Sequence, residues 1–265
     1  MSTAAQTVEA PFLLESLDQG VLTLTLNRGR QLNPLSEDML AALTESLSTT
    51  ALRSDVRAVI IAAEGKGFCA GHDLKQMRSN HGSEYYQTLF ERCSGVMRSL
   101  VELPKPVIAR VQGIATAAGC QLVATCDLAV ASTDAQFAVS GINVGLFCST
   151  PSVALSRNVQ RKRAFEMLIT GDFVDADTAV EYGLINHAVA PGELDAKIAE
   201  LTDSIKAKPP VAVETGKRMF YKQIEMNLED AYRYAGETMA CNMLAEDTVE
   251  GVDAFIEKRK PSWNQ

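Results

Sequence analysis

The chain has 265 residues, 46% of them hydrophobic, so it can bury the core of one large domain, with or without a smaller appendage. Its formal net charge of −8 and sequence pI of about 5.0 argue against a nucleic-acid partner, because nucleic-acid-binding surfaces are basic. No apolar stretch is long enough to span a membrane, and we expect no membrane partner.

Six cysteines are scattered along the chain without a CxxC pair or a histidine at metal-ligand spacing. Most of them lie within apolar runs, so the pattern predicts reduced, buried thiols and no metal site. Residues 1–15 contain no lysine or arginine and no apolar core run, unlike a secretory signal or a transit peptide. We therefore expect a cytoplasmic protein.

Strands and helices alternate along the first half of the chain. Alternating or unbroken apolar runs predict strands, and apolar residues at helical spacing predict helices, the first of which Ser36 can cap. The predicted strands cover residues 22–26, 57–63, 107–111 and 127–131. The predicted helices cover residues 36–47, 86–103 and 120–126. This alternation predicts an α/β fold with a largely parallel sheet and covering helices.

From about residue 150 onward the pattern is helical. Amphipathic helices are predicted over residues 161–169, 176–182, 194–207, 211–226 and 228–243. No internal repeat, low-complexity tract or Pro/Ser-rich linker separates these helices from the first half. We therefore expect a helical layer attached to the core rather than an independent domain.

The stretch GKGFCAGHDLKQM at residues 65–77 follows the predicted strand 57–63. Small residues in this stretch let a ligand approach the main chain closely. Asp73 lies where a helix over Leu74–Met77 would begin, and a carboxylate at that position suits the helix dipole. Such a turn exposes free N–H groups that can bind an anion or a developing oxyanion.

The stretch VIARVQGIATAAG at residues 107–119 has the same organisation: a buried strand, a glycine and a run of small residues before a helix. Taken alone, the run is better explained by close packing of the helix on a neighbouring element. Two such turns after parallel-type strands favour a ligand site, because α/β folds bind ligands at the carboxyl ends of strands. One N–H from each turn could then hold a single carbonyl oxygen.

Five segments, in order, resemble the enoyl-CoA hydratase/isomerase family, also called the crotonase superfamily. LTLTLNRGRQLNPLSEDML resembles its entry strand, CoA-adenine loop and first helix, and the two turns resemble its two oxyanion segments. TGDFVDADTAVEYGLINHAV resembles the segment that closes the core, and EGVDAFIEKRKPSW resembles the C-terminal signature. Each segment alone is weak evidence for the family, but the five together, in order and at the right separations, are specific to it.

The resemblance implies a crotonase-like spiral of ββα units, with two near-perpendicular sheets and a C-terminal helical trimerisation region. It assigns residues 1–205 to the spiral core. Residues 206–265 become a helical region that mediates oligomerisation and covers a neighbour's CoA site. A homotrimer or dimer of trimers acting on acyl-CoA thioesters is implied, with coenzyme A as part of the substrate and no other cofactor or metal.

The family's shared chemistry implies an enolate-like thioester anion held by two backbone N–H groups. By motif position these groups fall on His72 and Ala118. The same motif positions of the family imply the residues that contact CoA. These are Arg28, Gln31, Leu32, Ala70, Asp73 and Leu74, together with Phe255 and Lys258 from a neighbouring subunit.

Two positions depart from the family's hydratases, which place a glutamate on either side of the catalytic water. The first position is Gln121, whose amide can hydrogen-bond a water but cannot take its proton. The second is Gly141, which has no side chain. General acid–base catalysis typically supplies about 10²–10⁴ in rate, so we expect ordinary hydration to be crippled.

Other candidate pocket residues keep two interpretations each. Cys148 is a thiol beside the thioester or, as favoured by the lack of a flanking His or Lys, a small buried hydrophobe. Ser149, next to Thr150, is a pocket residue or simply the cap of a helix that begins near Pro151. The imidazole of His72 could act as a base near neutral pH, although its implied task uses only the backbone N–H and its side chain could point away.

Three functions remain open at this point. The first is an acyl-CoA enzyme with little hydratase activity, such as a decarboxylase of malonyl-type CoA or a thioesterase. The Gly-His-Asp variant resembles acyl-CoA decarboxylases, and decarboxylation needs an oxyanion hole but no base. The second is a hydratase whose water is held by Gln121 and polar atoms near Ser149. The third is a non-catalytic acyl-CoA-binding protein.

Overall fold

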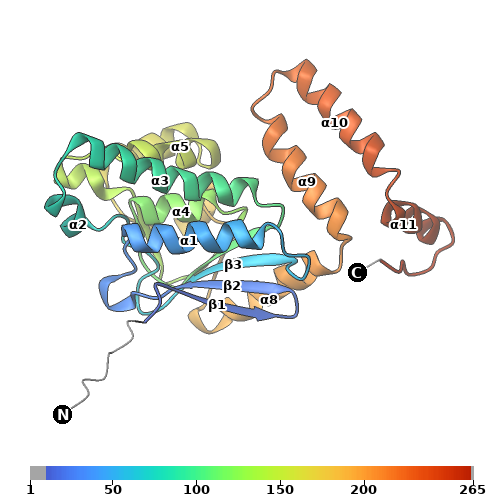
Figure 1. The fold of residues 1–265 in the computed structure, drawn as a ribbon, viewed down its shortest axis with the longest axis horizontal. Helices are drawn as coiled ribbons and strands as arrows, with labels where there is room; N and C mark the ends of the chain where they lie inside the picture. Colours follow the sequence, from blue (N-terminus) through green and yellow to red (C-terminus); the bar gives the residue numbers. More distant parts are fainter. Residues whose placement is uncertain (1–9, 264–265) are drawn as a thin grey trace, which may run out of the picture.

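The structure is a computed structural model that describes residues 10–263 and has an α/β body with a helical arm (Figure 1). Most of the N-terminal segment examined for a targeting signal lies outside the described residues. Within 10–263, no helix is long and apolar enough to cross a membrane.

Six strands form the main sheet in the order β1-β2-β3-β4-β6-β9. Only the pair β1–β2 is antiparallel, a hairpin that turns through Gln19 and Gly20, and the other pairs are parallel. The strands are β1 (Leu13–Asp18), β2 (Val21–Leu26), β3 (Ala58–Ala63), β4 (Val107–Val111), β6 (Leu128–Ser132) and β9 (His187–Val189). The prediction of a largely parallel sheet is therefore confirmed. The unbroken apolar sequence of β3 is typical of a strand covered on both faces.

A second, three-stranded sheet has the order β5-β7-β8. Its strands are very short: β5 (Ala115–Thr116), β7 (Gln136–Ala138) and β8 (Val174–Asp175). β5 also makes an isolated bridge between Ala115 and Cys69, which ties the two predicted turns together. The sequence did not predict these strands, because two or three residues show no periodic pattern.

Helices cover both faces of the main sheet. In Figure 1, α1, α3, α4 and α5 lie on one side of the sheet and α8 lies on the other. The helices of the body are α1 (Glu37–Thr50), α2 (Leu74–Ser79), α3 (Ser83–Glu102), α4 (Ala118–Thr125), α5 (Ser149–Asn158), α6 (Arg161–Thr170), α7 (Ala176–Tyr182) and α8 (Leu194–Lys206). The short 3₁₀ helices are η1 (Gly29–Gln31), η2 (Ser140–Val144) and η3 (Pro191–Glu193).

The caps of two helices agree with the sequence. Ser36 accepts a hydrogen bond from the N–H of Met39 at the start of α1, and Asp73 accepts from Lys75 and Gln76 at the start of α2. Both predicted starts are confirmed. Each cap satisfies N–H groups that the first turn of a helix leaves unpaired.

Two apolar clusters hold the body together. The larger lies between the sheet and α1, α3 and α4, and includes Leu24, Met39 and Ile61. The smaller joins the opposite face of the sheet to α8, where Ile108 and Ile198 are among its buried residues. Because each face of the sheet is covered, β3 buries its side chains on both sides.

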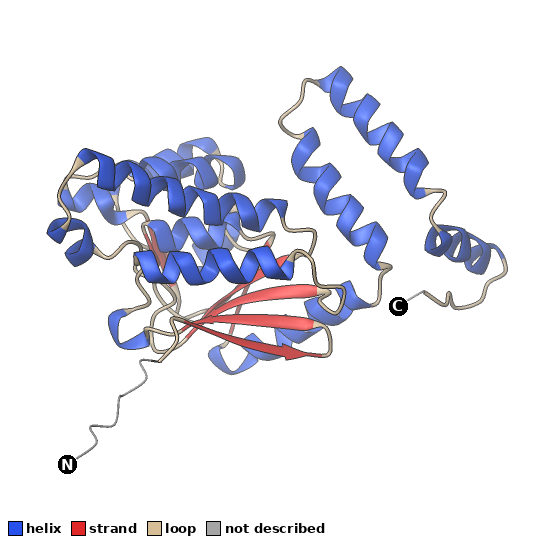
Figure 2. Cartoon of the chain, in the orientation of Figure 1, coloured by secondary structure: helices blue, strands red, loops and turns tan. Residues whose placement is uncertain are grey.

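The arm is helical throughout (Figure 2) and consists of α9 (Pro210–Gln223), α10 (Leu228–Asn242) and α11 (Glu246–Ile256). It extends away from the body, and only the beginning of α9 lies close to α8 in Figure 1. The proposed domain boundary between residues 205 and 206 falls at the last turn of α8. That boundary stays a prediction.

Candidate active site

Asn33 holds the first turn in shape. Its side chain is fully buried and its Nδ2 lies within 2.9–3.1 Å of the carbonyl oxygens of Glu64, Gly67 and Phe68. Its backbone has φ +50, a conformation that asparagine tolerates better than most residues. Sequence reasoning missed this role, and the only available signal was an asparagine in the polar loop before α1.

The second turn packs directly against the first. A Cβ atom at Gly119 would lie 2.1 Å from the carbonyl oxygen of Cys69, so only glycine permits this approach of α4. Ala117, just before α4, has φ +51 and ψ −120, which is a strained backbone for a residue with a side chain. The close-packing explanation of the small residues is therefore correct, and the same packing brings the start of α4 to the first turn.

The two backbone groups implied by motif position meet here. Gly71 has φ +86, and a Cβ atom there would lie 3.1 Å from the backbone nitrogen of Ala118. Gly71 directly precedes His72, so His72 and Ala118 lie at one junction between the two turns. Within residues 10–263, neither the N–H of His72 nor that of Ala118 donates to a protein acceptor. Free N–H groups at a helix start are suited to a developing negative charge.

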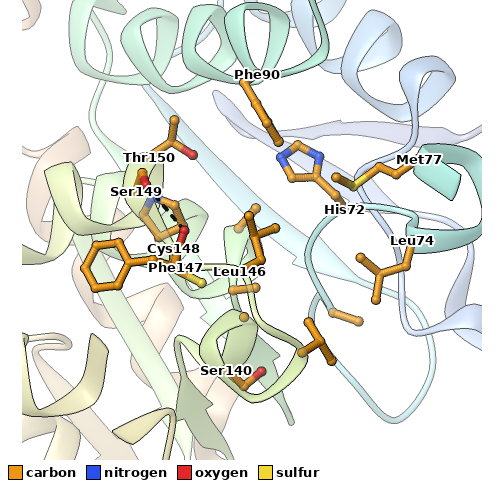
Figure 3. A pocket seen from close by; sticks show the side chains of 16 residues that line it. His72, Leu74, Met77, Phe90, Ser140, Leu146, Phe147, Cys148, Ser149 and Thr150 are labelled. Carbon is orange, nitrogen blue, oxygen red and sulfur yellow. Dashed lines mark hydrogen bonds between the residues drawn. The ribbon is translucent and has the colours of Figure 1, made fainter. Parts of the chain in front are cut away.

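A cavity of about 210 Å³ opens over this junction (Figure 3). Its walls come from the first turn and α2, from Phe90 of α3, from the start of α4, and from the segment 140–151. Most of its lining is apolar, as Figure 3 shows for Met77, Phe90 and Leu146. An apolar pocket with a few directed polar groups is typical of a small-molecule site.

Comparison with known proteins identifies the family of this chain. A profile of the family described as enoyl-CoA hydratase/isomerase matches residues 16–265. The chain belongs to this family. A mouse protein named enoyl-CoA hydratase domain-containing protein 3, mitochondrial, is 44% identical over 245 residues, which cover 92% of this chain and 82% of the mouse protein. A short-chain-enoyl-CoA hydratase of Clostridium acetobutylicum is 32% identical over 250 residues, covering 91% and 92% of the two chains.

Solved structures of the family show the same fold. An enoyl-CoA hydratase structure from Mycobacterium smegmatis matches with a TM-score of 0.95 and 61% identity, covering 97% of this chain and 100% of that chain. The human enoyl coenzyme A hydratase domain-containing protein 3 matches with a TM-score of 0.92 and 42% identity, covering 95% and 100% of the chains. The predicted crotonase-like α/β fold is confirmed.

The predicted cytoplasmic location is contradicted. Vertebrate relatives at 40–44% identity are named mitochondrial, and these names point to the mitochondrion. The prediction rested on the composition of residues 1–15, a short segment whose first nine residues lie outside the described structure.

Part of the candidate set lines the cavity. These residues are Ala70, His72, Leu74, Ala118, Gly141, Cys148, Ser149 and Thr150. The others lie elsewhere in the described chain: Arg28, Gln31, Leu32, Asp73, Gln121, Phe255 and Lys258. Among these, the guanidinium of Arg28 lies over the ring of Phe12, 3.6 Å from its centre. Phe255 is 84% exposed on α11 and does not line the cavity.

Neither Gln121 nor Gly141 places an acid or a base in the cavity. Gln121 is buried in α4 and does not line the cavity, and its Oε1 has no hydrogen-bond partner within the described residues. At Gly141, a Cβ atom would lie 2.5 Å from the carbonyl oxygen of Leu146 and 2.7 Å from Sγ of Cys148. The turn η2 therefore excludes any side chain at this position, including a glutamate.

Cys148 and Ser149 lie side by side in the cavity wall, and the predicted helix cap at Ser149 is not observed. Cys148 is buried at 6% exposure, and burial raises the pKa of its thiol, which keeps it protonated at neutral pH. Ser149 is wrong as a cap, because α5 begins at Ser149 itself and no side chain caps it. The Oγ of Ser149 instead donates to the carbonyl of Phe147 at 3.3 Å, since the chain turns too early for the predicted geometry. Of the six cysteines, Cys241 alone is exposed.

The side chain of His72 lies in the cavity wall rather than pointing away. Its ring packs edge-on against Phe90, with 5.5 Å between ring centroids. Its Nδ1 lies 3.3 Å from the carbonyl oxygen of Leu35. Burial lowers the pKa of this imidazole, and the contact with Leu35 only partly opposes that effect. The ring is therefore neutral at pH 7.

Proposed function

We propose that this protein binds acyl-CoA thioesters and stabilises their enolates with the backbone N–H groups of His72 and Ala118. The observation that carries the proposal is the presence of two N–H groups, unpaired within residues 10–263, at one junction beneath an apolar cavity. Removing one donor from such an oxyanion hole typically costs about 10²–10³ in rate. Coenzyme A enters as part of the substrate, and no resident cofactor or metal is required.

Hydration is a poor candidate for the main reaction. Addition of water needs a group that takes its proton, and neither family position supplies one. Crotonyl-CoA should therefore be hydrated at least about 10²-fold more slowly than by a family hydratase with both glutamates.

Decarboxylation of a malonyl-type CoA is a second candidate. The departing CO₂ leaves its electron pair on the α-carbon, so the step requires enolate stabilisation but no base. The absence of any carboxylate among the cavity-lining residues of the described chain favours this reaction over hydration. Release of CO₂ from malonyl-CoA measures it directly, and a protein that binds acyl-CoA without any turnover would be a binding protein only.

The decisive experiment replaces the glycine between the two donors. Gly71→Val forces a side chain into a φ of +86 and against the nitrogen of Ala118, so acyl-CoA binding and turnover should both be lost. Gly192→Val is the matched control, because a Cβ atom there meets nothing within 4 Å. Circular dichroism checks that both variants fold. Unchanged binding in Gly71→Val would overturn the proposed oxyanion site.

The arm supports a further proposal on assembly. Its helices expose large apolar side chains, among them Leu244 at 83% and Phe255 at 84%. We propose that other copies of the chain cover these faces in a homotrimer or a dimer of trimers. In such an assembly Phe255 and Lys258 would reach the CoA site of a neighbour.

A further inference from the structure

The imidazole of His72 has one nitrogen in a hydrogen bond and one without a partner in the described part of the chain. With Nδ1 3.3 Å from the carbonyl oxygen of Leu35, the neutral ring carries its proton on Nδ1 and donates it there. We assign this tautomer from the hydrogen-bond geometry. Nε2 then holds a lone pair, and within residues 10–263 it is buried with no hydrogen-bond partner.

An unpaired buried acceptor is unusual and unfavourable. Leaving such a group without a partner is costly, so an unpaired acceptor in the wall of a cavity calls for an explanation. Figure 3 shows the imidazole between Phe90 and Met77, across the cavity from Thr150. The same residue therefore brings its backbone N–H to the oxyanion junction and its ring to the adjacent wall.

No other group of the cavity can take a proton as readily. Among the described residues that line it, His72 and Cys148 are the only ones with titratable side chains. The thiol of Cys148 stays protonated because burial raises its pKa. The hydroxyl of Ser140 is paired with that of Thr116 at 2.7 Å, and hydroxyls are very weak bases.

Two carboxylates on the elements packed around His72 are already engaged. Glu37 of α1 forms an ion pair with Arg92 of α3 at 3.1 Å. The carboxylate of Asp73 accepts from the N–H groups at the start of α2. Nothing among these contacts supplies a permanent counter-charge for an imidazolium, so the ring remains neutral and its lone pair available until a negative charge forms nearby.

We propose that Nε2 of His72 is the base that removes a proton from the α-carbon of a bound acyl-CoA, so the protein exchanges α-hydrogens with solvent. The C–H bond breaks and its electron pair moves onto the thioester oxygen, which the N–H groups of His72 and Ala118 hold as an enolate. The proton moves to Nε2, giving an imidazolium beside the enolate. Reversal returns a proton to the α-carbon, so no further reactant is needed. This inference rests on the proposed function.

The experiment uses butyryl-CoA in D₂O with the full chain, and mass spectrometry follows deuterium at the α-carbon. His72→Phe removes the lone pair but keeps the backbone N–H, so binding of butyryl-CoA should change less than about threefold. Exchange should fall at least about 10²-fold, the usual contribution of a general base. His72→Gln, a polar variant that cannot take the proton, should show the same loss and guards against misfolding of the first variant.

His81→Phe is the matched control, because His81 is exposed and bonds Tyr86 away from the cavity. It should exchange at the wild-type rate. Equal exchange in the wild type and in both His72 variants would overturn the role of the imidazole and leave the oxyanion hole standing. A wild-type protein that binds butyryl-CoA without exchange would also overturn it. A wild-type protein that binds no acyl-CoA would instead overturn the proposed function.

Discussion

The body and the arm are built from similar proportions of apolar residues but use them differently. In the body, strands such as β3 and β4 bury nearly every side chain, and the apolar faces of α1 and α3 pack on the sheet. In the arm, α9 has no buried residue and α10 buries only Ala231. Burial stabilises by roughly 25 cal/mol per Å² of apolar surface, so only the body is supported by its own core.

The arm is held to the body by directed polar contacts instead. Nζ of Lys217 donates to Asp127 at 2.6 Å and to the carbonyl oxygens of Leu100 and Lys105 at 2.8 and 2.9 Å. The side chain of Lys105 also pairs with Glu214. The body is therefore specified by its packed core. The arm is attached to it by a few buried charges, and its apolar faces stay exposed, where another protein surface could cover them.

Breaking the buried anchor should have the largest effect. Lys217→Met leaves Asp127 as a buried carboxylate without its counter-ion, still held by the N–H of Val107, because the two side chains are 6% and 14% exposed. Removing one partner of a buried pair typically costs about 3–5 kcal/mol of unfolding free energy, measured by denaturant titration. Arg163→Met is the control, since the Arg163–Glu166 pair is largely exposed and should matter by less than about 1 kcal/mol. Equal effects would show that the anchor is not what attaches the arm.

Overfilling the packed junction in the body should have a smaller effect. Gly119→Ala sets a methyl group against the carbonyl of Cys69, and such overpacking costs about 1–3 kcal/mol. Gly95→Ala, in the middle of α3 with nothing within 4 Å of the new atom, should stabilise by about 1 kcal/mol. Thermal melts compare the two variants. A harmless Gly119→Ala would mean that the turns are not locked together.

Changing the exposed face of the arm should affect assembly rather than folding. Phe255→Ser removes an 84% exposed ring and should weaken self-association by about 1 kcal/mol or more. Light scattering over a dilution series measures the change as a shift toward smaller species. Leu52→Ser, equally exposed at 89% but on the body, should leave the mass unchanged. Identical masses for both variants at every dilution would argue against the arm as the interface.

The smallest effect concerns pH and belongs to the body. Burial lowers the pKa of His72 below its ordinary value of 6.5 in the folded chain, so the unfolded chain binds the proton first as pH falls. The contribution of His72 to stability is therefore present above pH 6.5 and is lost as pH falls below it. His72→Phe should flatten this part of the stability–pH curve, whereas His81→Phe should not. A wild-type slope in His72→Phe would place the titration elsewhere.

Much of the body could be predicted because its elements are long and regular. The apolar runs of β3 and β4 and the helical spacing of α1 are local patterns, and the caps Ser36 and Asp73 follow from local chemistry. The short strands β5, β7 and β8 could not be predicted, because a partner distant in sequence defines them. The failed cap at Ser149 has the same origin, since the preceding turn is set by Gly141 and Leu146.

By itself, the sequence determined the family, the order of the main strands and helices, and the two turns where small residues bring backbone N–H groups together. By resemblance to the family, it also predicted that Gln121 and Gly141 stand where the family's hydratases have glutamates. Only the tertiary structure decided that Gly141 excludes any side chain, that Gln121 lies outside the cavity, and that His72 lies in the cavity wall with Nε2 buried and unpaired within the described residues. The reason is physical: backbone conformation follows local residue types, whereas the direction and burial of a side chain depend on segments that meet only after folding.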